Sequence, residues 1–257
     1  MTIGKPGPWA GLILAALAGG CAINIPPPKT AAVAPAMADA AWGRVLTRFV
    51  DGRGRIDFAW VAKDPVDLDA FVAHLAQTSP ESAPALFPTR DAVLAYYLNG
   101  YNALAMYNAV RSGIPPELGS IKVRFFYRDR FVMGGRRLSL YALENRVVRP
   151  MGDPRVHFAL NCMVKGCPRL PREPFEAGRL DSQLDAAARL FFSEERNVQP
   201  DSGRQSVRFS EILRFYKGDF LEKAPSLIAY ANSYRAEKIP LDWTVEFIPY
   251  DWTLNAQ

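Results

Sequence analysis

The segment from Thr89 to Pro116 constrains the fold more than any other part of the sequence, because it has the start, the period and the end of one long helix. Thr89 is a typical N-cap residue, and Gly113-Ile114-Pro115-Pro116 is a typical helix terminator. The apolar residues between them recur at helical spacing over a wide surface: Val93, Leu94, Tyr97, Leu98, Tyr101, Leu104, Ala105 and Val110. We therefore expect a helix over residues 90–112 at the centre of the fold.

Two amide side chains, Asn99 and Asn102, lie within this apolar helix. A buried amide costs about 1 to 3 kcal/mol unless it is hydrogen-bonded, so each should have a partner. The pair either fixes the packing of the helix or bonds a neighbouring loop, such as the one at Cys162. Both roles stay open on the sequence alone.

The remaining elements indicate the fold class. Further helices are predicted at residues 40–50, from Asp64-Pro65 onward, and at 139–149, 180–192 and 226–234. Strands are predicted at residues 125–132, 136–140, 155–161, 207–209 and 245–252. Helices dominate the first half, and strands gather later. This order predicts an α+β fold with helices packed on a small antiparallel sheet.

The N-terminal residues predict export. Lys5 is the only charge in the first twenty residues and precedes an apolar run from Trp9 to Ala18. The run is too short to span a membrane, so residues 1–20 are predicted to be an export signal. The ending Ala18-Gly19-Gly20-Cys21 resembles a bacterial lipobox, in which Cys21 is lipidated. Because Ala18 stands where Leu is commonest, ordinary signal cleavage nearby stays open.

The predicted location follows from this ending. Ala22, rather than Asp, follows the cysteine, and by the usual sorting rule this indicates an outer-membrane lipoprotein on the periplasmic side of a bacterial membrane. The proline- and alanine-rich residues 21–40 suit a tether. Residues 41–256 are long enough for a single globular domain.

The charge of the chain does not indicate nucleic-acid binding. It has 31 Lys+Arg against 26 Asp+Glu, and the basic residues are scattered. Several arginines between residues 124 and 137 lie near aromatic residues, a combination that also occurs in nucleic-acid-binding proteins. The predicted export argues against a nucleic-acid partner and favours solvated strand faces as the interpretation of these arginines. An anionic envelope component or substrate stays open.

The segment from Arg155 to Pro168 carries the candidate chemistry. Val156, Phe158 and Leu160 alternate with polar or small residues, which predicts a strand with His157 on one face and a loop opening at Cys162. The chain has only two histidines and three cysteines, so a histidine and a cysteine this close in sequence are a specific signal for a catalytic pair. A thiolate nucleophile needs a nearby base or cation to lower its pKa from about 8.5.

Three other states fit the same cysteines. Cys162 and Cys167 could form a disulfide in an exported protein. With His157 and a carboxylate they could hold zinc, although the ligand set is incomplete. They could also be buried thiols that pack as small apolar side chains.

Glu144 is the acid nearest in sequence to the predicted His157 strand. It lies on a mostly apolar face of the helix predicted after Ser139. A carboxylate there needs a cationic or hydrogen-bonding partner. His157 and Arg149 are equal candidates.

Five motifs in order resemble the domain-of-unknown-function 547 family (DUF547), from about Trp42 to Asn255. The motifs are Tyr97-Leu98-Asn99-Gly100-Tyr101-Asn102-Ala103, the segment 138–149, His157-Phe158-Ala159-Leu160-Asn161-Cys162 with Cys167-Pro168, Phe215-Tyr216-x-x-Asp219-Phe220, and Tyr250-Asp251-Trp252-x-Leu254-Asn255. The family name assigns no activity.

The family is in turn similar to the papain and transglutaminase-like cysteine enzymes, which implies a helix packed on an antiparallel sheet. Asn102 stands where the transglutaminase helix has its cysteine, so the thiol of Cys162 would be a permuted nucleophile. Asn145 stands where the DUF547 family commonly has histidine, so no second histidine is expected to act.

The resemblance and the residues together predict acyl transfer, or hydrolysis of an amide or thioester. Cys162 would be the nucleophile, His157 the general base and Glu144 the group that orients the histidine. Asn161 or Asn99 would support the loop or the oxyanion. This mechanism needs no organic or metal cofactor.

A second function stays open: a non-catalytic envelope module in which a Cys162–Cys167 disulfide or a metal site stiffens a binding loop. The expected partners are an unknown substrate or envelope protein and the membrane, through a lipid anchor at Cys21. No nucleic-acid partner is expected.

Overall fold

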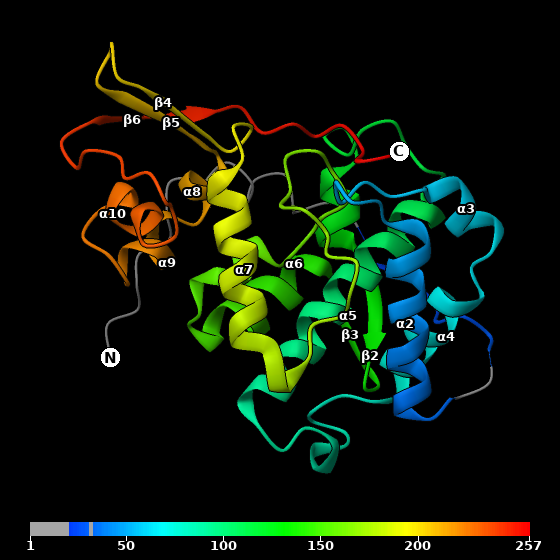
Figure 1. Cartoon of the computed structure of the whole chain (residues 1–257). Coiled ribbons are helices and arrows are strands. Elements are labelled where there is room, and N and C mark those ends of the chain that lie inside the picture. The colour runs from blue at the N-terminus through cyan, green and yellow to red at the C-terminus, as the bar shows by residue number, and fades with distance from the viewer. Residues whose placement is uncertain (1–20, 31–32) are drawn as a thin grey trace.

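A computed structural model describes residues 21–30 and 33–257, and it combines helices with two small sheets (Figure 1). Within these residues each sheet has three strands, in the orders β1-β2-β3 and β4-β5-β6. The predicted α+β class is confirmed, although each sheet contains one antiparallel and one parallel pair. The export signal predicted for residues 1–20 lies outside the described residues.

The strands are β1 (Ile23–Asn24), β2 (Asp129–Met133), β3 (Arg136–Leu138), β4 (Val198–Asp201), β5 (Ser206–Ser210) and β6 (Thr244–Ile248). The α-helices are α2 (Pro35–Phe49), α3 (Phe58–Lys63), α4 (Val66–Gln77), α5 (Arg90–Arg111), α6 (Leu140–Leu143), α7 (Leu180–Ser193), α8 (Ile212–Phe215), α9 (Lys217–Leu221) and α10 (Leu227–Asn232). The 3₁₀ turns are η2 (Pro84–Leu86), η5 (Arg149–Met151), η6 (Pro154–Phe158) and η7 (Ala177–Arg179), and the π-helices are η3 (Val123–Arg128) and η4 (Glu144–Val148). No helix of the described residues is long and apolar enough to cross a membrane.

Helix α5 is the central element, as the sequence predicted. The Thr89 hydroxyl accepts a hydrogen bond from the Ala92 N–H at 3.1 Å, which caps the first turn. The helix ends at Arg111, and Gly113 follows with a φ of +81°, a conformation that favours glycine. Every residue from Leu94 to Ala109 is buried, so α5 is surrounded by other elements on all sides.

The buried side chains form two cores. The larger core surrounds α5 and includes α2, α4 and the β2–β3 hairpin. The smaller core lies between α7, the β4–β6 sheet and α8 to α10, and Phe158 belongs to it. In Figure 1 the β4–β6 sheet and α8 to α10 lie on one side of α7, and α2 to α5 lie on the other. Residues 154–168 therefore run where the two cores meet.

The strand predicted at residues 155–161 is wrong, because Pro154–Phe158 forms a 3₁₀ turn. The Asp153 carboxylate accepts the Arg155 N–H at 2.9 Å, and Pro154 takes the first position of the turn. Val156, His157 and Phe158 are all buried. A strand prediction from alternating residues assumes that one face is buried and the other exposed. That assumption fails here, because the residues of both faces are buried.

The hairpin predicted at residues 125–140 is partly confirmed. β2 and β3 pair antiparallel across Gly134 and Gly135, whose positive φ values of +53° and +80° suit a tight hairpin turn. The predicted strand from Phe125 is wrong over its first residues, which belong to η3. Phe125 is fully buried, and its N–H bonds the Ile121 carbonyl at 2.9 Å, so core packing favours a helical turn there.

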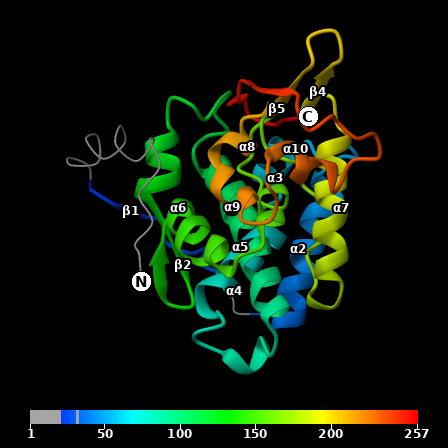
Figure 2. The ribbon, with the colours of Figure 1, turned by 90° about the vertical axis from the view of Figure 1, so that its left-hand side faces the viewer.

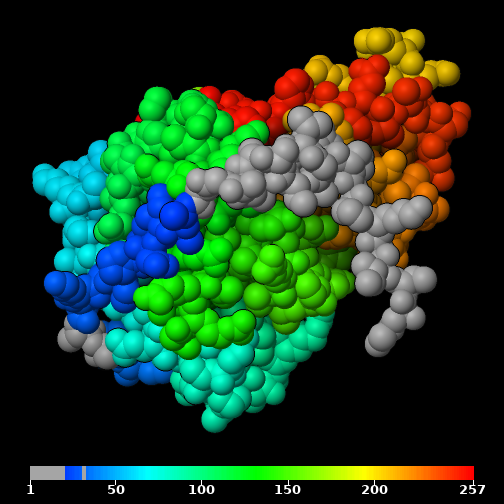
Figure 3. All heavy atoms as spheres, turned by 180° about the vertical axis from the view of Figure 1, so that it is seen from behind, coloured from blue at the N-terminus to red at the C-terminus, as the bar shows by residue number. Residues whose placement is uncertain are grey.

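The described N-terminal residues lie against the domain. β1 runs parallel to β2, and the Ile25 N–H bonds the Arg130 carbonyl at 2.8 Å. Figure 2 shows β1 beside β2, and Figure 3 shows the blue N-terminal segment on the green surface of the region near residue 130. Helix α2 begins at Pro35, so the boundary predicted at residue 40 falls within a helix.

Candidate functional site

His157 is held by a carboxylate and an arginine from two other elements. Its Nε2 lies 2.8 Å from Oδ2 of Asp219, which is on α9. Arg149 donates from Nε and Nη2 to the two oxygens of the same carboxylate, at 2.8 Å each. The Arg149 side chain is 29 % exposed and that of Asp219 26 %, whereas the His157 ring is 1 % exposed. The histidine is thus the buried end of this arrangement.

The protonation of this group follows from its surroundings. Burial lowers the pKa of His157, and the hydrogen bond to Asp219 offsets this only in part, so the imidazole is neutral at pH 7. Burial alone would raise the pKa of Asp219, but the bonds from His157 and Arg149 hold it well below its usual range. A neutral ring bonded to a carboxylate through Nε2 carries its proton there. Nδ1 is then a free acceptor.

The Nδ1 atom of His157 is buried and has no hydrogen-bond partner among the described residues. The ring stacks on Tyr216, with centroids 3.7 Å apart, and Phe220 packs edge-on at 5.5 Å. These contacts and the bond to Asp219 fix the ring orientation. The imidazole is therefore held in one orientation, with Nδ1 buried.

Glu144 bonds two tyrosines, and neither of its predicted partners. Its Oε2 accepts the Tyr101 hydroxyl at 3.2 Å, and its Oε1 accepts the Tyr216 hydroxyl. The prediction that Glu144 bonds His157 or Arg149 is wrong, because the π-helix η4 carries Glu144 toward α5, and Arg149 already bonds Asp219. Burial first, and then the charge of Glu144, raise the pKa of both tyrosines, so they stay protonated donors.

Cys162 and Cys167 form a disulfide, with Cα atoms 6.2 Å apart. The Tyr250 hydroxyl lies 3.1 Å from the Cys162 sulfur and 3.2 Å from that of Cys167. The Cys162 N–H also points at the Cys167 sulfur, at 2.9 Å. Cys167 is 2 % exposed, and Cys162 is partly exposed. Of the states open on the sequence, the structure contains the disulfide.

The loop that contains the disulfide is held from α5. Asn102 is 1 % exposed; its Nδ2 donates to the Ala159 carbonyl at 3.0 Å and its Oδ1 accepts the Asn161 N–H at 2.7 Å. Asn161 in turn bonds the Met163 N–H at 2.7 Å and the Pro168 carbonyl at 2.6 Å. The prediction that a buried amide of α5 bonds the Cys162 loop is confirmed for Asn102.

Asn99 fixes a different segment. Its Oδ1 accepts the Trp42 indole N–H at 3.2 Å and the Phe175 N–H at 2.9 Å, and its Nδ2 donates to the Phe175 carbonyl at 2.8 Å. These bonds join α2, α5 and the residues before α7. They give Asn99 a role in helix packing.

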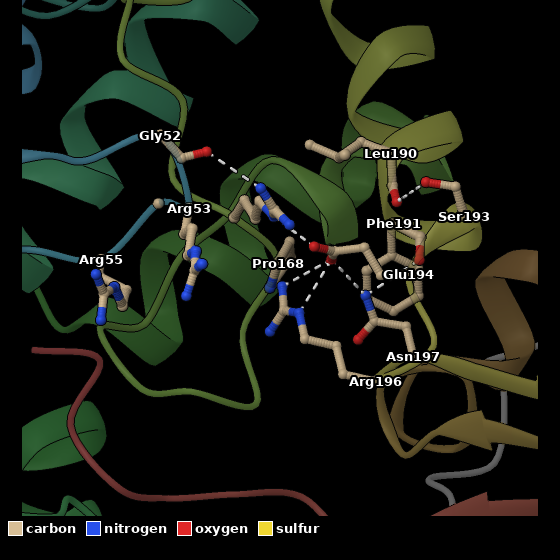
Figure 4. Close-up of polar contacts among 12 residues, drawn as sticks. Gly52, Arg53, Arg55, Pro168, Leu190, Phe191, Ser193, Glu194, Arg196 and Asn197 are labelled. Carbon is tan, nitrogen blue, oxygen red and sulfur yellow. Dashed lines mark hydrogen bonds and ion pairs between the residues drawn. The ribbon is translucent and has the colours of Figure 1, made fainter. Parts of the chain in front are cut away.

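A group of polar residues braces the other side of the loop, and Figure 4 shows the contacts of Glu194 with Arg196 and Asn197. Arg196 donates to the Lys165 carbonyl at 2.7 Å and to the Cys167 carbonyl at 3.1 Å. Glu194 holds Arg196 through Oε2, at 2.9 Å from Nη2, and accepts Asn197 Nδ2 at 2.9 Å. Nothing in the local sequence pattern of these residues predicts this role.

The structure does not assemble the predicted catalytic group of Cys162, His157 and Glu144. The sulfur of Cys162 is in the disulfide, Nδ1 of His157 bonds neither sulfur, and Glu144 reaches the histidine only through Tyr216. Asp219 takes the place predicted for Glu144 beside His157.

Three residues that contact His157 or the disulfide were not predicted from the sequence, although a signal for each was present. Asp219, Tyr216 and Tyr250 all lie in motifs that carry the family resemblance, yet they received no role there. Within the described residues, no group of three or more His, Cys, Asp or Glu side chains is placed to hold a metal ion.

Cys21 is the first described residue, and it is a free, exposed cysteine. Its carbonyl accepts a hydrogen bond from Arg128 Nε at 3.1 Å. Together with the pairing of β1 and β2, this bond places Cys21 at the surface near η3 and β2.

Comparison with known families gives one match. Residues 87–192 match the family model described as "Protein of unknown function, DUF547". No curated protein and no solved structure matches the chain. The matched residues contain α5, Glu144, His157 and both bonded cysteines, whereas Asp219 and Tyr250 lie beyond them.

Proposed function

We propose that this chain, whose match over residues 87–192 supports membership of the DUF547 family, is an exported cell-envelope binding module with a structural Cys162–Cys167 disulfide. The observation that carries the proposal is the pairing of these cysteines, because it removes both cysteines of the segment after His157 from nucleophilic chemistry. The family description itself assigns no activity.

The environment of the disulfide supports a structural role. Asn102 holds the backbone before Cys162, and Arg196 holds the carbonyl of Cys167. The Tyr250 hydroxyl contacts both sulfurs. A bridge held on three sides fixes the loop in one conformation, and a rigid loop loses little entropy when it binds a partner.

Export and anchoring belong to the same proposal. A stable disulfide suits the oxidising periplasm and not the cytosol. The apolar run before Cys21 supports an export signal, and the position of Cys21 after two glycines supports lipidation. Radioactive fatty acid should label the wild type and not Cys21→Ala. Equal labelling of both, or no labelling of the wild type, contradicts the anchor.

The test of the structural disulfide is alkylation of the native protein, purified from the periplasm without reductant. We expect no iodoacetamide adduct at Cys162 or Cys167 until the disulfide is reduced. The control is Cys162→Ala, which frees Cys167 and should give an adduct once the protein is unfolded. An adduct at Cys162 in the native wild type contradicts the proposal.

One observation favours a second function, cysteine-dependent acyl transfer or hydrolysis after reduction of the bridge. His157 is neutral, is oriented by Asp219 and has a free Nδ1, which is the state that a general base requires. In this scheme a thiol reductant frees Cys162, Nδ1 takes its proton, and the thiolate attacks the acyl carbon to form a thioester while the amine or thiol leaving group departs with that proton. Water or an acceptor amine then takes the acyl group and releases Cys162. Asp219 replaces Glu144 as the orienting group.

The two proposed functions predict different reactivities of Cys162 in the reduced protein. If Cys162 is a poised nucleophile, its alkylation after mild reduction is faster than that of a model thiol, and His157→Ala slows it. If the bridge is structural, the reduced Cys162 reacts no faster than a model thiol, and His157→Ala leaves the rate unchanged.

A further inference from the structure

A second feature of the fold, separate from the cysteines, is a pocket of about 480 Å³ between the β2–β3 hairpin, α5 and η4. Four arginines line it: Arg130 on β2, Arg136 and Arg137 on β3, and Arg146 on η4. All four are exposed. Among the described residues, no hydrogen bond or ion pair satisfies any of their guanidinium groups.

The one acid that lines this arginine pocket does not neutralise it. Glu81 accepts the Tyr97 hydroxyl at 2.6 Å, and its one negative charge, which Arg136 helps to stabilise, stands against the four positive charges of the arginines. The remaining lining is apolar and includes Val93, Leu138 and Val147. Four like charges in one concave site repel one another, so the site gains from an anion that enters it.

The arginine side chains restrict the chemical class of anion that the pocket can bind. The planar guanidinium matches the oxygens of phosphate and carboxylate in a bidentate arrangement, and several such groups converging on one site suit a multiply charged anion. A phosphate monoester carries about −1.5 to −2 charges near neutral pH, about twice that of a carboxylate. The apolar lining can receive the uncharged part of the same molecule.

We propose that the arginine pocket binds a phosphorylated ligand. This inference rests on the proposed function as a binding module and names the ligand class of that module. None of the cysteines lines the pocket, so the redox state of Cys162 and Cys167 does not decide it.

The position of the pocket allows two sources of phosphate. Arg130 pairs with Asn24 in the register of β1 and β2, only three residues after Cys21. Three extended residues span about 10 Å. If Cys21 carries a lipid, the pocket therefore lies about one Debye length (about 8 to 10 Å) from the headgroup layer. The phosphate then belongs to a membrane lipid; otherwise it belongs to a soluble phosphorylated molecule.

The test uses the full chain with Cys21→Ala, so that no anchor contributes to binding. Inorganic diphosphate is titrated by calorimetry, and vesicles of phosphatidylcholine with phosphatidic acid, a lipid whose headgroup is a phosphate monoester, are tested by co-sedimentation. The pocket variant is Arg137→Gln with Arg146→Gln. The matched control is Arg53→Gln with Arg208→Gln, which removes the same charge from exposed arginines outside the pocket.

We expect saturable binding of diphosphate that weakens at least about tenfold in the pocket variant and stays unchanged in the control, because charge-assisted hydrogen bonds are lost only in the former. Vesicle binding with the same pattern assigns the phosphate to a lipid headgroup. Diphosphate binding without vesicle binding assigns it to a soluble ligand.

Three results overturn the inference: no saturable diphosphate binding, an equal loss in both double variants, or binding of citrate that is as tight as that of diphosphate. A native Cys162 that reacts with iodoacetamide would contradict the structural disulfide and leave the diphosphate titration unchanged. The two proposals therefore fail separately.

Discussion

Replacing Asn102 with alanine should destabilise the fold and loosen the disulfide loop together. The side chain is 1 % exposed and bonds the Ala159 carbonyl and the Asn161 N–H. Alanine leaves one buried acceptor and one buried donor without partners, at about 1 to 3 kcal/mol each. We therefore expect the free energy of unfolding to fall by about 2 to 6 kcal/mol.

The matched control is Asn232→Ala. Asn232 makes the same pair of bonds, to the Ile239 carbonyl at 2.8 Å and the Ile239 N–H at 2.9 Å, but it is partly exposed. Water can replace its bonds, so its loss should cost about 1 kcal/mol. Urea unfolding, followed by intrinsic fluorescence, measures both variants.

The same two variants also distinguish a local loosening of the disulfide loop from a general loss of stability. Because Asn102 holds the residue before Cys162, dithiothreitol should reduce the disulfide of Asn102→Ala faster than that of the wild type. A drop of about 1.4 kcal/mol in the cost of opening the loop gives about a tenfold faster reaction. Equal reduction rates in Asn102→Ala and Asn232→Ala, or a stability loss under about 1 kcal/mol for Asn102→Ala, would refute the reasoning.

Removing the bridge with Cys162→Ala and Cys167→Ala should lower the free energy of unfolding by about 2 kcal/mol, the loop-closure value for a separation of 5 residues, and reductant should have no further effect on this variant in urea unfolding. Arg196→Met should speed reduction by dithiothreitol, because it frees the carbonyls of Lys165 and Cys167; an unchanged rate would show that the brace is dispensable. Acid should destabilise the protein. Because burial lowers the pKa of His157, the histidine of the unfolded chain is protonated at a higher pH than that of the folded protein. The free energy of unfolding therefore falls as the pH drops below about 6.5. His157→Gln should flatten that slope, and a slope equal to the wild type's would contradict the assignment.

The central helix could be predicted because its signals are local. The Thr89 cap, the helical period and the Gly113 terminator all lie within the segment that they define. The amide of Asn102 could also be predicted to need a partner, since burial of an unpaired amide is costly whatever surrounds it. Such arguments require no knowledge of distant residues.

The turn at His157 could not be predicted from alternation. Where both sides of a segment are buried, a period of two carries no information about its conformation. The informative signal was the pair Asp153-Pro154, a cap followed by a first helical residue.

The residues that contact His157 and the disulfide could not be predicted from the sequence, because they are distant along the chain. His157 and Asp219 are 62 residues apart, and Cys162 and Tyr250 are 88 apart. Only the packing of the two cores brings them together. Glu144 was assigned to His157 because it was near in sequence, whereas the π-helix directs it to Tyr101.

The most direct test of the account is the mass of the tryptic peptides that contain Cys162 and Cys167, prepared from periplasmic protein without reductant and with free thiols blocked at lysis. The account predicts one cross-linked peptide species, which separates into two only after reduction, because Lys165 places a cleavage site between the cysteines. Blocked thiols at both positions, with no cross-linked species, would contradict it and return Cys162 to the role of a free nucleophile.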